Sequence, residues 1–367
     1  MRGLRSLGID LSGGTPSASG AYALQGERTY ALPGGPISLL TTGLLRVAGK
    51  LELGRWLTQV AHVDSEALDR TSLERWLATT FRDPTARCLV QALVRLTSYA
   101  NAPTVQSAGA HVRQLQAALS GNVRYIDGGW QTIVSALRDR VVAGGGRIES
   151  GRAVRAVRAQ PEGFSVHLDD GHSLAAQDVV IAGGPDTVRN LLGSDEALDH
   201  WMGAPQPVLA ACLDVGLRRL PRARATFALG IDRPLYFSVH SAAAHLCDDP
   251  QAAVVHVLSY LPPTSSIDSS AVEAELEGIL DTLQPGWRAL VSTKRFLPKM
   301  TVAPAVTATS AQGERGRPGV NIAGRPGLFA VGDWVGPEGM LADASFASAE
   351  AVAATIAASP RSRRQAA

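Results

Sequence analysis

The sequence is poor in cysteine and in metal-binding motifs, and these shortages argue against two classes of site. Its three cysteines, Cys88, Cys212 and Cys247, lie far apart and form no C-x-x-C pair. That spacing argues against a disulfide framework and a zinc site, and we expect three buried thiols. The eight histidines show no H-E-x-x-H or comparable spacing. We therefore predict no metal site.

Long apolar runs and an excess of one charge are also missing. No run of about 18 apolar residues occurs, so no membrane-spanning segment is predicted. The first residues, MRGLRSLGIDLSGG, lack the apolar core of a signal peptide, which makes the cytoplasm the expected compartment. Lys+Arg total 35 and Asp+Glu 33, a net charge of +2 that gives no reason to expect nucleic acid as a partner.

The chain is long enough for two domains, or for one large interleaved domain. Its 367 residues, of which 45% are hydrophobic, can bury a sizeable core. Residues 1–120 are mostly helical in pattern and carry no obvious chemistry. Within them, Thr71-Ser72-Leu73-Glu74 fits a helix capping box, and further helices are predicted at about 84–99 and 107–119.

A different pattern begins at residue 125. Trp130 to Val142 has the spacing of an amphipathic helix, and Arg147–Glu149 is predicted to be a short strand. After three alternating runs, Asp178–Ala182 is continuously apolar, which is typical of a buried parallel strand. Residues 205–260 contain several more strand candidates.

The strongest local signal is the segment from Gly327 to Ala354, GLFAVGDWVGPEGMLADASFASAEAVAA. A buried strand ends at Gly332, an acid follows, and a glycine-rich loop leads into a helix of small residues. Glycines let a backbone approach a ligand, and the amides at a helix N-terminus point toward it. Asp333 is placed to accept hydrogen bonds from sugar-like hydroxyls. The alternative is an ordinary strand–turn–helix in which Asp333 only caps the loop.

Together these segments resemble the flavin-containing amine oxidase and phytoene-desaturase-like superfamily of FAD-dependent oxidoreductases. The resemblance covers about 120–200 and 285–357. It implies an α/β plus α+β fold, in which an incomplete Rossmann-like FAD-binding domain is interleaved with a helix-and-sheet substrate domain. The residues that carry it are Asp127-Gly128-Gly129 with the helix after it, Gly146-Arg147-Ile148, Ala153–Val157, Asp170-Gly171, Asp178–Ala182 and Gly327–Trp334.

The resemblance also implies domain boundaries. The substrate domain would use residues 1–120 as its helical part and 201–284 as its sheet. The FAD-binding domain would use 121–200 and 285–360, and 361–367 is expected to be a disordered tail.

The same resemblance implies a set of cofactor-binding residues. Val154 would meet the adenine, and Asp333 would meet the ribityl and pyrophosphate part of FAD, with Gly332 allowing the approach. Three residues would open the helix whose N-terminal amides face the pyrimidine edge of the flavin, where its dipole favours negative charge. These are Met340, Leu341 and Ala342. No catalytic residue is assigned.

One family feature has no match in this sequence. Members begin with a strand, a G-x-G-x-x-G turn and a helix. Gly144-Gly145-Gly146 precedes a predicted strand instead of a helix, and Gly183-Gly184-Pro185 also fails the pattern. We therefore expect Met1 to follow that unit and FAD to bind weakly to the chain as given. Open sheet edges would then favour self-association.

The implied function is hydride transfer from an apolar or amine substrate to the flavin of an FAD-dependent oxidoreductase. We expect enzyme activity once the missing N-terminal unit is restored. No lysine aligns near the flavin, which favours a small apolar substrate. Two segments are candidates for lining the substrate pocket, Tyr99–Asn101 and Leu235–His240. The alternative is that both only pack in the core or on the surface. The alternatives are a non-catalytic, flavin-free binding or partner protein that kept the fold, and an N-terminally truncated gene product.

Overall fold

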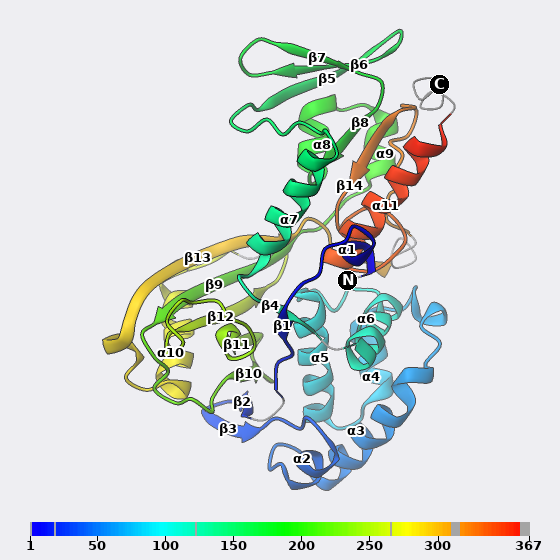
Figure 1. Cartoon of the computed structure of the whole chain (residues 1–367). Coiled ribbons are helices and arrows are strands. Elements are labelled where there is room, and N and C mark those ends of the chain that lie inside the picture. Colours follow the sequence, from blue (N-terminus) through cyan, green and yellow to red (C-terminus); the bar gives the residue numbers. More distant parts are fainter. Residues whose placement is uncertain (1, 18–19, 122, 265, 310–315, 360–367) are drawn as a thin grey trace. The chain divides into compact units, whose positions relative to one another are not determined.

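The computed structural model divides the chain into two compact units (Figure 1). Unit 1 comprises Met1–Gly8, Arg138–Pro207 and Ala303–Ala367, and unit 2 comprises Ile9–Leu137 and Val208–Val302. Helices and sheets are mixed in both, which confirms the predicted fold class. The structure describes residues 2–17, 20–121, 123–264, 266–309 and 316–359. The expected tail at 361–367 lies outside these residues.

Unit 2 is built on a seven-stranded mixed sheet. Its central strands are antiparallel neighbours, whereas β10 and β2 run parallel, with Phe227 opposite Ala21. In sheet order the strands are β13 (Val291–Ala303), β9 (Val208–Leu217), β12 (Ala253–Leu261), β11 (Leu235–Val239), β10 (Phe227–Gly230), β2 (Ala21–Gln25) and β3 (Arg28–Ala31).

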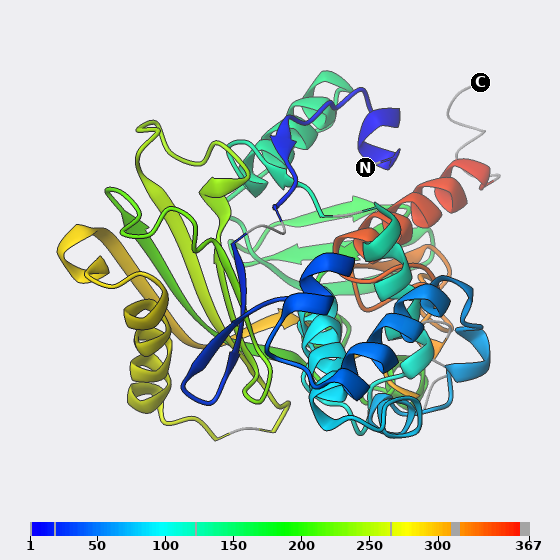
Figure 2. The same cartoon turned by 90° about the horizontal axis from the view of Figure 1, so that it is seen from below.

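Helices cover both faces of this sheet because side chains alternate along each strand. Leu213, Phe237 and Val257 share one core with α10 (Ser269–Leu283), whereas Leu258 and Tyr260 share another core with helices on the opposite face (Figure 2). The helices of that opposite face are α2 (Pro36–Thr41), α3 (Val47–Gln59), α4 (Leu73–Thr80), α5 (Pro84–Ser98) and α6 (Ala108–Gly121). Short 3-10 turns lie at η1 (Val60–His62), η2 (Glu66–Leu68), η3 (His240–Ala242) and η4 (Trp287–Leu290).

Side-chain caps fix where several of these helices begin. The Asp83 carboxylate accepts a hydrogen bond from the Ala86 amide at 2.9 Å and starts α5. The predicted capping box is wrong by one residue: the hydroxyl of Ser72, not that of Thr71, accepts from the Arg75 amide at 3.2 Å. Thr71 is part of the preceding turn.

Unit 1 contains two small sheets. The first is an antiparallel meander of β5 (Val154–Gln160), β6 (Gly163–Leu168) and β7 (Ser173–Ala176). The second is a parallel pair of β8 (Val179–Ala182) and β14 (Leu328–Val331). Around them lie α1 (Arg2–Ser6), α8 (Pro185–Leu192), α9 (Glu196–Met202) and α11 (Ala342–Ala358).

The remaining elements join the two units along the chain. α7 (Trp130–Ala143) contains the point in the chain, between Leu137 and Arg138, where unit 2 ends and unit 1 resumes. β1 (Gly13–Gly14) pairs with β4 (Tyr125–Ile126) in unit 2. Across the described parts of the chain, no helix combines the length and apolarity needed to span a bilayer.

Candidate functional site

The parallel strands of unit 1 end side by side, each followed by a glycine and then a helix. Ala182 of β8 stands opposite Val331 of β14, and the next residues are Gly183 and Gly332. The Trp334 indole N–H donates to the Gly183 carbonyl at 2.9 Å and ties the two ends together. Ligands bind at the carboxyl ends of parallel strands in such sheets, so this edge is the candidate site.

Gly332 has a backbone that other residues adopt only with strain. Its φ is +148°, and a Cβ there would lie 3.2 Å from Cδ1 of Trp334. Its amide donates to the Ser348 hydroxyl of α11 at 3.1 Å. The strand end is therefore fixed against the helix, and glycine leaves space at this point for the Trp334 ring.

Arg317 holds the loop between β14 and α11. Its guanidinium donates to the carbonyl oxygens of Asp333, Gly336 and Glu338 at 3.1, 2.9 and 3.0 Å. These three hydrogen bonds hold the loop together, and the charge of Arg317 lowers the pKa of the nearby Asp333 carboxyl against the larger effect of burial.

The Asp333 carboxylate is half-buried and has accepting capacity to spare. Burial raises its pKa above the usual value, against the opposing effects of its own backbone amide and of Arg317. Within the described chain, the only hydrogen bond found for this carboxylate comes from its own amide. A partly desolvated carboxylate gains from additional donors. Asp333 therefore fits a ligand that presents hydroxyl groups.

The start of α11 is also shaped for a ligand. Leu341, the residue before the helix, has φ +54°, and no side chain caps the first amides. A left-handed non-glycine residue costs on the order of 1 kcal/mol or more, and such strain gathers at ligand sites. Met340 is buried beneath this turn, and Ala342 is the first helical residue.

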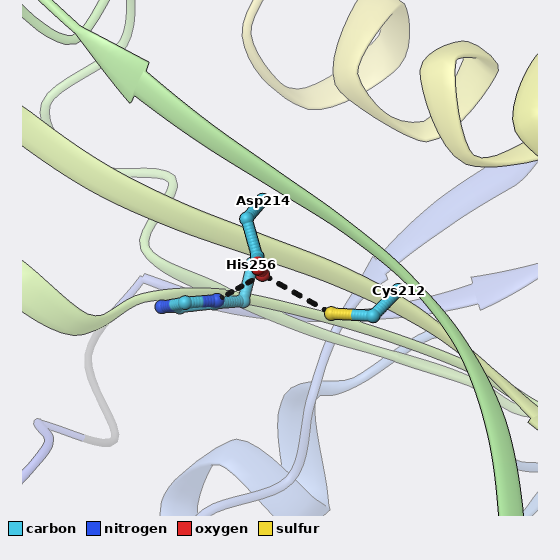
Figure 3. A group of neighbouring side chains, drawn as sticks. All are labelled: Cys212, Asp214 and His256. Atoms are coloured by element: carbon cyan, nitrogen blue, oxygen red, sulfur yellow. Dashed lines mark hydrogen bonds and ion pairs between the residues drawn. The ribbon is translucent and has the colours of Figure 1, made fainter. Parts of the chain in front are cut away.

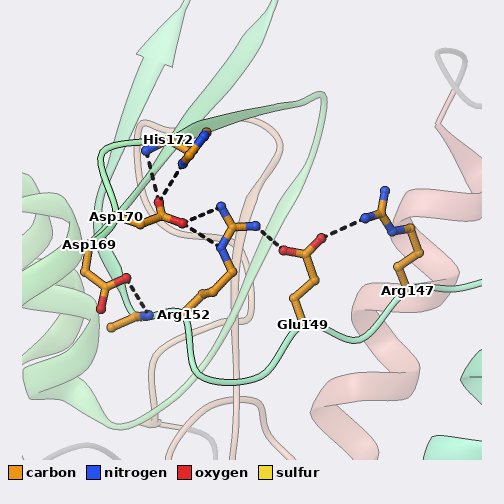
Figure 4. A network of polar contacts seen from close by, with 7 residues as sticks. Arg147, Glu149, Arg152, Asp169, Asp170 and His172 are labelled. Atoms are coloured by element: carbon orange, nitrogen blue, oxygen red, sulfur yellow. Dashed lines mark hydrogen bonds and ion pairs between the residues drawn. The ribbon is translucent and has the colours of Figure 1, made fainter.

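Val154, the sixth predicted cofactor residue, lies in the other sheet of unit 1. It begins β5, and its side chain is exposed. An ion-pair network fixes the chain before it: the Arg152 guanidinium pairs with Asp170 at 2.8 Å and with Glu149 (Figure 4). The predicted strand at Arg147–Glu149 is wrong, because this segment pairs with no neighbouring strand. The side chains of Arg147 and Glu149 belong to the ion-pair network instead.

A second polar cluster lies in unit 2, on the sheet face opposite α10. His256 of β12 stands opposite Asp214 of β9. One carboxylate oxygen, Oδ1, accepts from His256 Nδ1 at 2.6 Å and from the Cys212 thiol at 3.1 Å (Figure 3). The other oxygen, Oδ2, accepts from Arg295 at 2.8 Å. The cluster is a carboxylate surrounded by three donors.

The charges of this cluster follow from these contacts. Burial alone would raise the pKa of Asp214, but hydrogen bonds from His256, Arg295 and Cys212 outweigh it and hold that pKa well below its usual range. Burial and the carboxylate together raise the pKa of the Cys212 thiol, which therefore stays protonated. The ligating atoms of Cys212, Asp214 and His256 lie within 4.8 Å of one another, but hydrogen bonding already accounts for that spacing.

Further polar rings extend the same face. The His240 ring lies 4.1 Å from that of His256 and 4.5 Å from that of Tyr125. The Tyr236 hydroxyl lies 3.3 Å from His240 Nε2 and 3.4 Å from the Tyr125 hydroxyl. Burial and the neighbouring His256 lower the pKa of His240 to about 3, so its ring is neutral at ordinary pH.

Comparison with solved structures defines the class of fold. The chain resembles an oxidoreductase from Methanosarcina mazei, with 16% identity, a TM-score of 0.73, and coverage of 96% of this chain and 84% of the other. It also resembles putrescine oxidase solved with putrescine (15%, 0.70, 98% and 85%) and a candidate protoporphyrinogen oxidase from Exiguobacterium sp. 255-15 (18%, 0.67, 96% and 83%). At these identities the likeness shows a shared fold.

The family follows from the sequence itself. The model of the flavin containing amine oxidoreductase family matches residues 4–208, more than half of the chain. The chain therefore belongs to the flavin containing amine oxidoreductases, which confirms the family resemblance of the sequence. No curated protein matched it.

Proposed function

We propose that this family member is an FAD-dependent oxidoreductase that holds its cofactor at the carboxyl edge of β8 and β14. The observation that carries the proposal is the half-buried Asp333 carboxylate, which follows the glycine end of a parallel strand and has unused accepting capacity. When bound, a flavin accepts a hydride from a substrate carbon. The protein's part is to hold and orient both molecules.

Each predicted residue has a separate task in this proposal. Asp333 accepts from ribityl hydroxyls, and Gly332 allows the cofactor to approach the backbone. The uncapped amides after Leu341 face the flavin, where the positive end of the helix dipole stabilises negative charge. Buried Met340 keeps water from this turn, and exposed Val154 is available to the adenine.

We further propose that the substrate is a small apolar molecule or an amine that contacts the polar face of the unit 2 sheet. On that face the Asp214 carboxylate is paired with Arg295, whereas His240 and Tyr236 are neutral: burial lowers the pKa of His240 to about 3 and raises the pKa of Tyr236 well above its usual value. Burial also raises the pKa of Tyr99 to about 12. Neutral donors and rings suit an uncharged ligand better than an anion.

Titration with FAD tests the role of Asp333. Asp333→Ala should weaken FAD binding by about 1.5–3 kcal/mol, or about 10- to 150-fold, because a hydrogen bond to a charged acceptor is lost. The matched control is Glu162→Ala, which removes an exposed acid from the turn between β5 and β6. If Asp333→Ala lowered the melting temperature but kept the parent's FAD affinity, Asp333 would only cap the loop.

A further inference from the structure

Helices α2 and α3 of unit 2 present large aliphatic side chains to solvent. Ile37 and Leu40 of α2 are 78% and 71% exposed, and Val47 and Leu51 of α3 are 73% and 70% exposed. Each pair lies about one turn apart, so both side chains of a pair share a helix face. We call these four residues the α2–α3 apolar surface. Contiguous exposed apolar groups mark an interaction site, whereas scattered ones do not.

Contacts between the two helices hold α2 and α3 side by side. The Lys50 ammonium of α3 donates to the Leu40 carbonyl of α2 at 2.6 Å. Buried Leu39 of α2 reaches Gly54 of α3, where a Cβ would lie 3.7 Å from its Cδ2. α3 is thus apolar on two sides. Leu53 and Trp56 already fill the core, so core packing does not explain the outer pair.

The charges around this surface are positive. Arg46 directly precedes Val47, Arg55 lies one helical turn after Leu51, and both arginines are exposed. Lys50 lies between Val47 and Leu51 in the sequence. The carboxylate of Glu52, the one acid in these two helices, accepts hydrogen bonds from the Arg82 and Asp83 amides at 2.7 and 2.9 Å. Its charge is thereby used at the start of α5.

The composition favours a lipid surface over a protein partner. Protein interfaces are enriched in tyrosine and tryptophan, whereas Trp56, the only aromatic residue of α2 and α3, is buried. Aliphatic side chains bordered by lysine and arginine are the pattern of helices that lie in a membrane interface and attract anionic headgroups.

We propose that the α2–α3 apolar surface docks onto an anionic lipid bilayer. Its aliphatic side chains enter the boundary between headgroups and acyl chains, and Arg46 and Arg55 contact lipid phosphates. A protein docked in this way lies on the surface of the bilayer and needs no spanning helix. The inference is independent of the flavin site, because it depends only on side chains of α2 and α3.

Flotation of the full chain with vesicles tests this proposal. The chain should float with vesicles of phosphatidylcholine and phosphatidylglycerol, and less with phosphatidylcholine alone. Leu40→Gln with Leu51→Gln should lower the partition coefficient at least about tenfold, because two aliphatic groups no longer leave water. Leu119→Gln, at a 58% exposed position of α6, is the matched control and should float like the parent. Circular dichroism checks that each variant folds.

A second double variant tests how much the positive charges contribute to vesicle binding. Arg46→Gln with Arg55→Gln should remove the preference for anionic vesicles, and added salt should have the same effect on the parent. The proposal is overturned if the parent floats with neither vesicle, or if the leucine variants float as well as the parent. It is also overturned if light scattering shows a dimer that only the leucine variants dissociate, since a second copy would then cover the surface.

Discussion

Gly332 is the residue at which the backbone of the candidate site tolerates least change. Its φ is +148°, and the Trp334 ring lies 3.2 Å from the position that a Cβ would take, so a side chain there would be strained and would crowd that ring. We expect Gly332→Ala to lower the free energy of unfolding by about 1–3 kcal/mol. Gly319→Ala is the control, because Gly319 meets nothing within 4 Å and has no positive φ. Urea unfolding of both variants measures the difference, and equal stabilities would contradict the constraint.

His111 is a second residue whose surroundings fix its chemical state. The Gln106 side chain accepts from the Ala102 amide through Oε1 at 2.8 Å, so its amide nitrogen faces the imidazole Nε2 at 2.8 Å as a donor. The other ring nitrogen lies 2.7 Å from the Ser107 carbonyl and carries the proton. Burial lowers the pKa of His111 to about 4. The neutral ring is therefore part of the folded structure.

This state makes stability depend on pH. Between pH 6.5 and 4 the unfolded chain binds a proton at His111 that the folded chain does not bind, so stability falls as pH falls. From pH 7 to pH 5 the loss should be about 2 kcal/mol. His111→Gln should lack this part of the loss, although it is less stable at both pH values. Urea unfolding at the two pH values compares the proteins, and an unchanged pH dependence would show that His111 is not responsible.

At the scale of elements, α10 shows how a single cap secures a layer of the fold. The Asp268 carboxylate accepts from the Ser270 and Ala271 amides, both at 3.1 Å, and the helix then packs on one face of the seven-stranded sheet. Asp268→Ala should cost about 1 kcal/mol of stability, and Asp268→Asn should retain most of it. Thermal melts of the two variants provide the test. Equal losses would mean that the charge, and not the cap, stabilises α10.

Elements with a strong local pattern were accessible from the sequence. Continuous apolar runs predicted both β8 and β14. Leu328, Phe329 and Ala330 of β14 are buried as expected, but Val180 of β8 is 42% exposed, so the expected burial of β8 is wrong at that position. The strands β2 and β3 were missed within a segment described as helical. β2 also pairs with β10, about 200 residues further on, and nothing in a short window reveals that partner. β3 pairs with β2 across a tight turn at Gly26, which is a local signal that the helical interpretation overlooked.

The two candidate sites, the Asp333 loop and the cluster of Cys212, Asp214 and His256, also differ in how far the local sequence reveals them. Asp333 was predicted because strand, glycine, acid and helix are consecutive in the chain. The contact of Cys212 and Asp214 with His256 depends on the register of β9 and β12, which no local motif encodes. The alternation of Cys212 and Asp214 on one strand was the available signal, since residues two apart share a face.

At the scale of the whole molecule, neither unit is a continuous stretch of chain. Unit 1 takes three segments and unit 2 takes two, so the chain passes between them repeatedly. The loop that carries Asp333 lies in the last segment of unit 1, far in sequence from the β5 segment that carries Val154. The domain boundaries inferred from the family resemblance, and the self-association expected from open sheet edges, stay predictions.

The central claim is that this chain binds FAD, and equilibrium binding of added flavins to the purified full chain tests it most directly. The account predicts saturation at one FAD per chain with a shifted flavin absorption spectrum, and weaker binding of FMN, which lacks the adenine proposed to meet Val154. Binding that is weak but saturable agrees with the account. If neither flavin bound at any concentration, the claim would be contradicted, and a flavin-free binding or partner protein with this fold would replace it.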